Sequence, residues 1–382
     1  MKITDIKIYA AEYAQTSKSL TNKKWVFIKV ETNEGIHGWG EVGSSVNVSE
    51  EFMATAIREV SPQLIGENPM DIDRLWNKIY RMFSYMGSRG FTTSLTAGFD
   101  IALWDIKGKV SGLPVYDLLG GSYRDPVRLY CNAWFTGCNT PEDYARAAKS
   151  NVVDNGHNAC KLDPFLEMTQ YHTMYQDGFI SQEGEQLGYD IVEAVREVVG
   201  PDIEILIDAH GHYNVPNAIR ISNNLFERFN IAWFEEPVPP EGINALKQVK
   251  ESTNAPICVG ERLYTRADFI PILENNLADF IMPDTVWTGG ISEIKKIATM
   301  AEAYYIPIAP HVIPGGPIEL ISASHVVTSV PNFYKLEHSH TFIPEHNNLL
   351  VEPYKIEDGH IHLNNKPGLG FELDEEKLEK LG

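Results

Sequence analysis

Residues 1–125 begin with an alternating pattern and continue with helical periodicity. Apolar and polar residues alternate through WVFIKVETNEGIHGWGEV, on either side of Asn33-Glu34-Gly35. A period of two that is interrupted by a glycine-containing turn predicts a β-hairpin. From about Ser49 to Val110 the apolar residues recur at helical spacing. Together these patterns predict a small α+β domain.

Residues 126–340 have a different pattern, in which short apolar segments alternate with amphipathic helical ones. The apolar segments are VRLYCNAW, HNACKLD, IEILIDAH, IAWFEEP, APICVGE, ADFIMPD, YIPIAPH and NFYKLEH. Eight strands with helices between them predict a (β/α)8-type TIM barrel. An open, doubly wound sheet uses the same alternation, but the regular spacing and the lack of a G-x-G-x-x-G motif opening a helix favour a closed barrel. Residues 341–382 are expected to return to the N-terminal domain, which would cap the barrel.

The charge and the cysteine content argue against several classes of protein. Acidic residues outnumber basic ones by 52 to 32, and the net charge of -20 argues against a nucleic-acid or anionic-membrane partner. The four cysteines lack C-x-x-C spacing, so neither a zinc site nor a disulfide framework is indicated. The N-terminal MKITDIKIYAAEY has no apolar core of the signal-peptide type. We therefore expect a cytoplasmic protein with a small-molecule partner.

Polar residues recur at the carboxyl ends of the expected barrel strands. They are Lys161, Asp208, Glu235, Glu261, Asp284, His311 and Glu337. In a (β/α)8 barrel these ends meet on one face, where catalytic groups converge. A single charged residue at a strand end is compatible with the start of a polar loop, but five carboxylates and a histidine at successive ends indicate a reaction site.

Three of these carboxylates predict a metal site. Asp208, Glu235 and Glu261 come from three neighbouring strands, and their charges would repel one another unless a cation lay between them. Ligation by oxygen alone suits Mg2+, which keeps open positions for water or substrate oxygens. Mn2+ is the plausible substitute.

Histidines near the strand ends predict acid-base chemistry. An aspartate beside a histidine fixes the tautomer of the imidazole and raises its basicity, so Asp284 and His311 suggest a general base. His210 lies two residues beyond Asp208, and the period of two along a strand would turn both side chains toward the barrel mouth. His212 has the same parity but lies further past the strand, so it is interpreted as a loop residue.

Two further strand-end residues have roles that the sequence leaves open. Lys161 is the cation among the strand-end residues, and it could hold a substrate carboxylate or act as an acid or base. Glu337 could hydrogen-bond an enediolate oxygen if it is protonated or suitably paired.

Several longer motifs carry a resemblance to a known family. They are DIALWDIKGK, FEEPV, GERLYTRADF, MPD, TGGISE, MAEAY, APH and the C-terminal PGLG, and they extend over nearly the whole chain. With these motifs the chain resembles the enolase superfamily, and within it the mandelate racemase subgroup. The resemblance implies that Asp208, Glu235 and Glu261 bind Mg2+. It also implies that His311 and Asp284 form a His-Asp dyad.

Further details narrow the resemblance within the subgroup. The Asp-x-His spacing of Asp208 and His210 resembles acid-sugar dehydratases of the galactonate dehydratase type, in which the histidine is the acid that expels the leaving hydroxyl. CKLDPF departs from the Lys-x-Lys motif of the racemase because position 163 is Asp, which speaks against two opposed bases. The long segment 164–186 is expected to be a lid or an oligomer contact, and with residues 12–25 to shape substrate choice.

The reaction that the resemblance implies is a syn or anti β-elimination of water from a sugar acid. Mg2+ would polarise the substrate carboxylate, His311 would remove the C2 proton, and His210 would protonate the departing 3-hydroxyl, giving a 2-keto-3-deoxy acid. Glu337 and Lys161 would help to hold the enediolate.

Three alternatives remain open at this point. A cycloisomerase of a 3,6-anhydro sugar acid, such as 3,6-anhydro-galactonate, would share the first half-reaction. An acid-sugar epimerase would need Lys161 as a base. A non-catalytic sugar-acid binder would not need the catalytic positions that this chain has filled. A homo-oligomer is also expected.

Overall fold

The N-terminal part of the chain forms an antiparallel sheet with helices on one face. The computed structural model describes residues 1–13, 24–43, 49–169 and 175–381. The sheet has the order β1 (Ile3–Glu12), β2 (Lys24–Thr32) and β3 (His37–Val42). Register pairs run from Val26↔Val42 to Glu31↔His37, which confirms the predicted hairpin.

The helices of this unit pack closely against its sheet. They are α1 (Glu50–Val60), the 3-10 turn η1 (Ser61–Gln63), α2 (Ile72–Met82), α3 (Phe91–Ser111) and the short α4 (Val115–Leu118). Glycines allow the closest approach, because a Cβ added at Gly40 of β3 would lie 1.9 Å from the carbonyl oxygen of Gly98 in α3. The long helix α3 therefore lies directly against β3.

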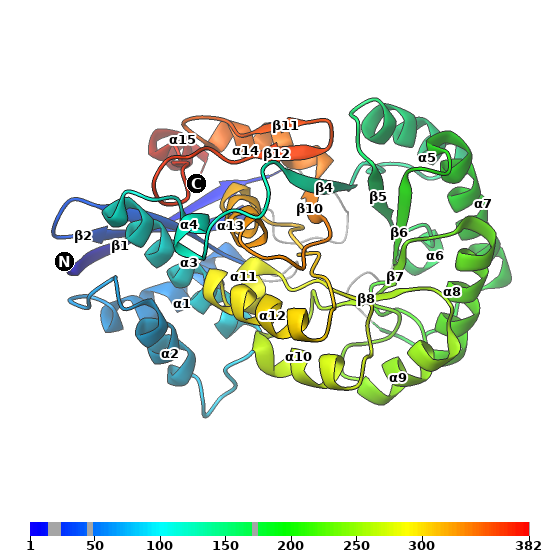
Figure 1. Ribbon diagram of the computed structural model, residues 1–382, viewed down its shortest axis with the longest axis horizontal. Coiled ribbons are helices and arrows are strands. Elements are labelled where there is room, and N and C mark those ends of the chain that lie inside the picture. Colours follow the sequence, from blue (N-terminus) through cyan, green and yellow to red (C-terminus); the bar gives the residue numbers. More distant parts are fainter. Residues whose placement is uncertain (14–23, 44–48, 170–174, 382) are drawn as a thin grey trace.

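The second unit is a closed barrel of parallel strands (Figure 1). Its strands are β4 (Val127–Asn132), β5 (Ala159–Leu162), β6 (Glu204–Asp208), β7 (Trp233–Glu235), β8 (Ile257–Val259), β9 (Phe280–Ile281) and β10 (Leu336–Ser339). Neighbours along this series from β4 to β9 are paired in parallel, and β10 pairs in parallel with β4. The seventh position is filled by Ile308, which bridges Ile281 of β9 and Phe333. The sheet is closed, so the barrel prediction is confirmed against the open-sheet alternative.

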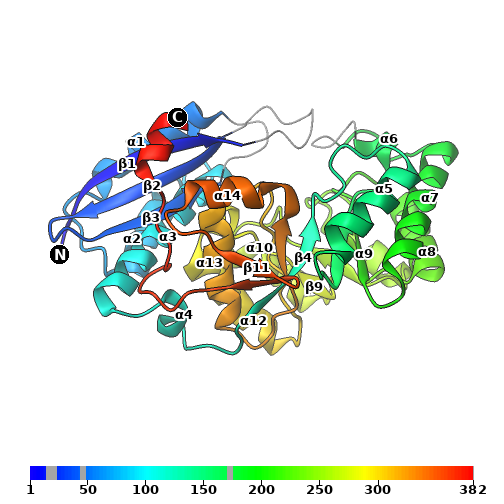
Figure 2. The ribbon, with the colours of Figure 1, turned by 90° about the horizontal axis from the view of Figure 1, so that it is seen from above.

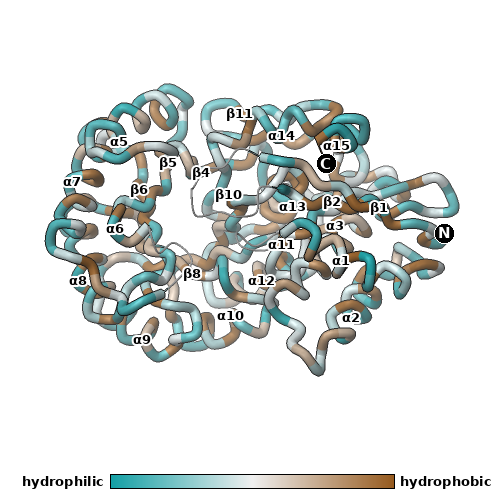
Figure 3. The backbone as a smooth tube through the Cα atoms, turned by 180° about the vertical axis from the view of Figure 1, so that it is seen from behind, coloured by the Kyte–Doolittle hydropathy of each residue, from teal (hydrophilic) through white to brown (hydrophobic). Residues whose placement is uncertain are grey.

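Helices surround the barrel in the order expected from the chain. They are α5 (Pro141–Ala148), the π-helical turn η2 (Lys149–Val153), α6 (Leu166–Thr169), α7 (Gln182–Val199), α8 (Val215–Phe229), α9 (Ile243–Ser252), α10 (Thr265–Glu274), α11 (Thr285–Thr288), α12 (Ile291–Ala303) and α13 (Pro317–Thr328). Figure 3 shows hydrophobic colour along β6 and β8 and mixed colours along the outer helices, as amphipathic helices around a buried sheet require.

The barrel strands bury both of their faces in different cores. Tyr130, Leu206, Trp233, Cys258 and Met282 belong to a cluster inside the barrel. The side chains between them along the strands pack outward against the helices in a second, larger cluster. This alternation follows from the period of two along a strand. The interior is a packed core, so groups at the carboxyl ends of the strands stand above an apolar floor.

The predicted long loop over 164–186 is wrong at both of its ends. Residues 166–169 form the short helix α6, and α7 already begins at Gln182. The helix starts early because the side chain of Ser181 accepts a hydrogen bond from the backbone N–H of Gly184, which caps its first turn. The lid or oligomer contact predicted here includes residues 170–174, and the specificity segment 12–25 includes residues 14–23, both outside the described residues.

The C-terminal segment contacts both units. Its elements are the 3-10 turn η3 (His340–Phe342), α14 (Ile343–Leu349), β11 (Lys355–Glu357), β12 (His360–His362) and α15 (Glu375–Leu381). Strand β12 pairs antiparallel with β4 of the barrel. Helix α15 lies across β1 (Figure 2), where Glu375 accepts hydrogen bonds from Tyr9 and Lys29 of the N-terminal sheet. Among the helices of the described residues, none has the length and apolarity needed to cross a membrane.

A buried aspartate joins the two units. Asp100 of α3 accepts hydrogen bonds from the backbone N–H of Ser292 at 2.9 Å and from its hydroxyl at 2.5 Å, at the start of α12. Burial, only partly offset by these donors, raises the pKa of Asp100 to about 7. In the unfolded chain the carboxyl would titrate near 3.8. Its contribution to the free energy of unfolding is therefore complete below pH 3.8 and falls as the pH rises to about 7.

Substitution of Asp100 should change both the free energy of unfolding and its dependence on pH, as measured by denaturant unfolding. We expect Asp100→Ala to lower the free energy of unfolding by about 1–3 kcal/mol, because buried donors lose their acceptor. We expect Asp100→Asn to weaken the fall in stability between pH 4 and pH 7. The control is Glu51→Gln, whose side chain is 72% exposed although it pairs with Arg58 of α1. A change larger than about 0.5 kcal/mol in that control would contradict the role of burial.

Candidate active site

Three carboxylates meet at the carboxyl ends of neighbouring barrel strands. Asp208 ends β6, Glu235 ends β7, and the two residues are register partners. Glu261 follows two residues after the end of β8. One oxygen from each carboxylate lies within 4.8 Å of the others, and all three residues are buried. This set of hard oxygen donors could hold a divalent cation, as the donor chemistry of Mg2+ requires.

Lys161 of β5 lies among these carboxylates. Its Nζ is 2.6 Å from Glu235 Oε1, 2.9 Å from Glu337 Oε1 and 3.4 Å from Asp208 Oδ2. Burial alone would lower the pKa of this ammonium, but the neighbouring carboxylates outweigh it and raise the pKa well above its usual value. The side chain is 1% exposed and its ammonium is directed at protein carboxylates. It is therefore a charged partner within the cluster.

His311 is held by Asp284 on the neighbouring strand position. The two residues form a parallel bridge, and His311 Nδ1 lies 2.7 Å from Asp284 Oδ2. The second oxygen of Asp284 accepts a hydrogen bond from the backbone N–H of Trp287 at 2.7 Å, which fixes the carboxylate. The free edge of the imidazole faces the carboxylates, with Nε2 3.4 Å from Glu261 Oε2. The predicted Asp-His pair thus has the geometry of an oriented acid-base group.

His210 approaches the carboxylate cluster by a different route from the one that the sequence pattern suggested. Strand β6 ends at Asp208, and His210 has a φ of 46°, in the left-handed region. Its position therefore follows from a turn and does not follow from the period of two along a strand. The backbone N–H of His210 donates to Asp208 Oδ1 at 2.9 Å, and its Nε2 lies 3.2 Å from Asp208 Oδ2.

Asp163 orients the ring of His210. The Nδ1 atom of His210 is 3.1 Å from Asp163 Oδ2, so this histidine also has a carboxylate partner. Burial would lower the pKa of His210, but Asp208 and Asp163 outweigh it and raise the pKa to about 9. The side chain of His210 is 24% exposed, so part of its ring is accessible to a small molecule. His212 is buried in the loop beyond, as the prediction of a loop residue stated, with its ring centre 5.9 Å from that of His210.

Glu337 of β10 has both oxygens engaged by protein donors. Oε1 accepts from Lys161 and from the amide of Asn132 at 2.8 Å, and Oε2 accepts from the backbone N–H of Val312 at 2.9 Å. Burial alone would raise the pKa of Glu337, but Lys161 and His311 outweigh it and lower the pKa. An ionised carboxylate accepts hydrogen bonds and donates none. Glu337 is therefore placed to balance and orient neighbouring cations.

Other polar residues of the site escaped the sequence analysis. Trp233 donates its Nε1 hydrogen to Glu235 Oε2 at 3.0 Å from below the cluster. Glu319 is buried near the dyad, where burial and the charges of Asp284 and Glu41 raise its pKa well above the usual range. Glu41 itself comes from β3 of the N-terminal unit and accepts from the backbone of residues 316 and 319. A glutamate inside an otherwise apolar strand was the available signal for Glu41.

The topology places the two histidines on opposite walls of the barrel. His210 follows the third barrel strand, β6, and His311 occupies the seventh position. In a closed barrel of eight positions, these two are separated by four steps in either direction. The carboxylates of β6, β7 and the turn after β8 lie along the wall between them. A small molecule bound over the cluster would therefore have one imidazole on each side.

Comparison with known proteins identifies the family. The family model described as enolase C-terminal domain-like matches residues 143–377. The model for the mandelate racemase / muconate lactonizing enzyme N-terminal domain matches residues 5–120. The chain therefore belongs to the enolase superfamily, in its mandelate racemase subgroup, which confirms the resemblance seen in the sequence motifs.

Similar proteins extend over nearly the full length. The D-galactonate dehydratase of Pectobacterium atrosepticum is 36% identical over 383 residues, covering 98% of this chain and 93% of that protein. The D-xylonate dehydratase of Haloferax volcanii is 34% identical over 370 residues, covering 96% of this chain and 87% of that protein. The crystal structure of a member of the enolase superfamily from Salmonella Typhimurium has a TM-score of 0.90 and 34% identity, with 100% and 98% coverage.

Removal of the Lys161 ammonium should destabilise the cluster strongly. Lys161→Met leaves Glu235 and Glu337 without their buried counter-charge, so we expect the free energy of unfolding to fall by about 3–5 kcal/mol in excess chelator. The matched control is Lys335→Met, because Lys335 is also buried but pairs with Glu204, which is 38% exposed. Equal losses for the two variants in denaturant unfolding would contradict the importance of the buried carboxylates.

Proposed function

We propose that this protein is a metal-dependent acid-sugar dehydratase. It would remove the C2 proton of a sugar acid, eliminate the 3-hydroxyl and give a 2-keto-3-deoxy acid. The observation that carries the proposal is the pair of histidines on opposite walls, each with a carboxylate partner at 2.7 or 3.1 Å and with the acidic cluster between them. The substrate class is supported by relatives named D-galactonate, D-gluconate and D-xylonate dehydratase.

The proposed metal ligands are Asp208, Glu235 and Glu261. Their oxygen-only chemistry and their separations within 4.8 Å fit Mg2+, with Mn2+ as a substitute. When bound, such an ion polarises the carboxylate of the substrate and lowers the pKa of the proton on the neighbouring carbon. The charge of the cluster also fits, because a divalent cation would relieve the repulsion among these three carboxylates.

His311 is the proposed base. Asp284 accepts the Nδ1 hydrogen of His311. When the ring is neutral, Nε2 therefore carries a lone pair on the side of the carboxylate cluster. Nε2 would accept the C2 proton, and the resulting imidazolium would be stabilised by Asp284 and by Glu337, whose Oε2 is 3.7 Å away. A base on the seventh strand position thus works from one wall of the barrel.

His210 is the proposed acid on the opposite wall. Asp163 accepts from its Nδ1. The other ring nitrogen, Nε2, which lies 3.2 Å from Asp208 Oδ2, would donate a proton to the departing 3-hydroxyl. Proton removal and hydroxyl departure from opposite walls favour the anti course of elimination over the syn course. Water and the enol are the products, and the enol becomes the 2-keto-3-deoxy acid by proton transfer to C3.

Lys161 and Glu337 are proposed as positioning residues. The sequence predicts that Lys161 could hold a substrate carboxylate. In the structure its ammonium contacts three protein carboxylates instead. Because Lys161 is already bound to Glu235 and Glu337, it also does not fit the free second base that an epimerase would need. Dehydration therefore agrees better with this site than epimerisation. The cytoplasmic location and the homo-oligomeric assembly stay predictions.

A panel of sugar acids tests the proposed function. We expect turnover of one or more aldonic acids of the galactonate, gluconate and xylonate class in the presence of Mg2+, detected as a 2-keto-3-deoxy product. Excess chelator should abolish the product, and Mg2+ or Mn2+ should restore it. Persistent turnover in chelator would exclude the metal assignment. Consumption of a 3,6-anhydro acid alone, with no water lost, would assign the protein to the cycloisomerase alternative.

Variants of the two histidines test the division of labour between them. His311→Asn should lower both dehydration and the exchange of the C2 proton with deuterated solvent by about 10²–10⁴-fold. His210→Asn should lower dehydration by a similar factor while exchange remains measurable by NMR. Asp163→Asn should resemble His210→Asn in kind but with a smaller loss. If His210→Asn and His311→Asn abolished exchange equally, the assignment of base and acid would be wrong.

A further inference from the structure

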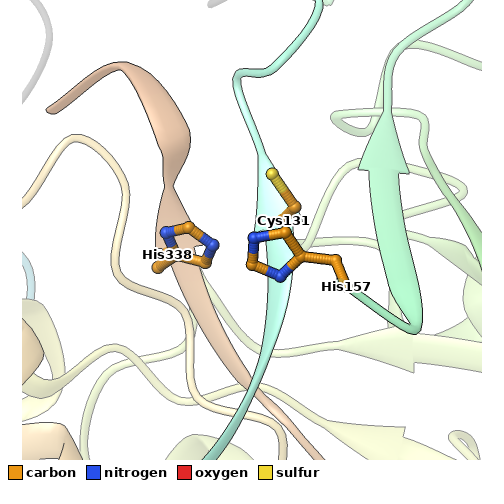
Figure 4. A group of neighbouring side chains, drawn as sticks. All are labelled: Cys131, His157 and His338. Atoms are coloured by element: carbon orange, nitrogen blue, oxygen red, sulfur yellow. The ribbon is translucent and has the colours of Figure 1, made fainter. Parts of the chain in front are cut away.

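A second group of potential metal ligands lies on the outer side of the barrel wall. Cys131 of β4 and His338 of β10 are register partners across the seam where the last barrel strand joins the first. The preceding residues on the two strands, Tyr130 and Glu337, face the barrel interior, so Cys131 and His338 face outward. His157 comes from the turn before β5. Figure 4 shows the two imidazole rings close to each other beside the Cys131 side chain.

The three side chains are buried, and His338 lacks hydrogen-bond partners within the described part of the chain. One donor atom from each lies within 4.8 Å of the others, and the residues are 0–3% exposed. Both ring nitrogens of His338 have no hydrogen-bond partner among the described residues. A buried polar atom without a partner costs about 1–3 kcal/mol, so such an atom in a folded protein points to an additional ligand.

We propose that Cys131, His157 and His338 bind a zinc ion. One thiolate and two imidazoles are ligands that zinc prefers, at Zn–S and Zn–N distances of about 2.3 Å and 2.0–2.1 Å. One donor atom from each residue lies within 4.8 Å of the others, which brings all three residue types to one place. The fourth tetrahedral position is left to a small ligand such as water. Oxygen-preferring Mg2+ would not compete for sulfur and imidazole donors.

The protonation states of the group agree with metal binding. Burial, with the neighbouring His340 and His360, lowers the pKa of His157 to about 4. Burial, with His157 close by, lowers the pKa of His338 well below its usual value. Both rings are therefore neutral at physiological pH and keep a lone pair for a metal. Burial raises the pKa of the Cys131 thiol, so zinc would displace the thiol proton into solvent on binding.

The proposed site lies at the seam where the last barrel strand pairs with the first. The turn before β12 covers the group, because the backbone N–H of Leu129 donates to Gly359 O at 2.8 Å. A Cβ added at Gly359 would lie 3.2 Å from His157 Nδ1, so the cover is close. Zinc bound here would join β4, β10 and the turn before β5 at the seam of the barrel. No local sequence motif indicates this site, because the three ligands are far apart along the chain.

Cobalt is a suitable probe because thiolate ligation gives it a sulfur-to-metal charge-transfer absorption. The full-length protein would be produced in zinc-depleted, cobalt-supplemented medium and measured in excess Mg2+. We expect this absorption in the wild-type protein and its loss in Cys131→Ser and His338→Gln. Cys160→Ser is the matched control, because Cys160 is a buried thiol on the neighbouring strand β5. Asp208→Asn should also keep the band, since the carboxylate cluster offers no sulfur.

A folded wild-type protein without the band, or a band that survives in Cys131→Ser, would overturn the proposal. If Cys131→Ser does not fold, zinc X-ray absorption of the wild-type protein decides the question. One sulfur scatterer at about 2.3 Å with nitrogen scatterers at about 2.0–2.1 Å is expected. Bound zinc with oxygen and nitrogen neighbours alone, or no bound zinc, would refute it.

Discussion

Negative charge concentrated at one end of a closed barrel is the constraint on which the rest of the site depends. Asp208, Glu235 and Glu261 are buried close together, and the apolar barrel floor beneath them screens their repulsion poorly. Lys161 relieves part of this repulsion and Glu337 in turn fixes Lys161. The proposed divalent cation would supply the rest. The fold tolerates this arrangement because each carboxylate enters from a different strand, whose backbone is held by its neighbours.

Much of the fold and of the site could be predicted because barrel units repeat. The apolar segments, the Asn33–Gly35 turn and the carboxylates at successive strand ends are local patterns. Seven of the eight segments form strands, and the seventh segment contributes only the isolated bridges of Ile308 and His311. Parallel strands that close into a barrel bring their carboxyl ends together, so residues far apart in sequence could be grouped without any knowledge of distances. The pairing of His311 with Asp284 followed from the same argument.

The remainder depends on geometry that local patterns do not encode. The approach of His210 to Asp208 is due to a left-handed turn, although the sequence argument assumed a continuing strand. The sequence suggested that Lys161 binds the substrate. The number of protein carboxylates around its ammonium depends on three-dimensional packing, which the sequence pattern does not encode. Glu41 enters from another domain, and the group formed by Cys131 and its two histidines joins distant segments. In each case the partner comes from a part of the chain with its own independent pattern.

The contact between Asp163 and His210 makes the residue types at these two positions depend on each other. This chain has Asp163 two residues after Lys161, where the Lys-x-Lys motif described above would have a second lysine. A lysine at that position would place an ammonium against the imidazole, whereas an aspartate without the histidine would add an uncompensated carboxylate to an already acidic wall. Each single replacement alone is therefore electrostatically unfavourable. The charge at position 163 and the residue at position 210 are therefore coupled, and a substitution at either position changes the electrostatic environment of the other.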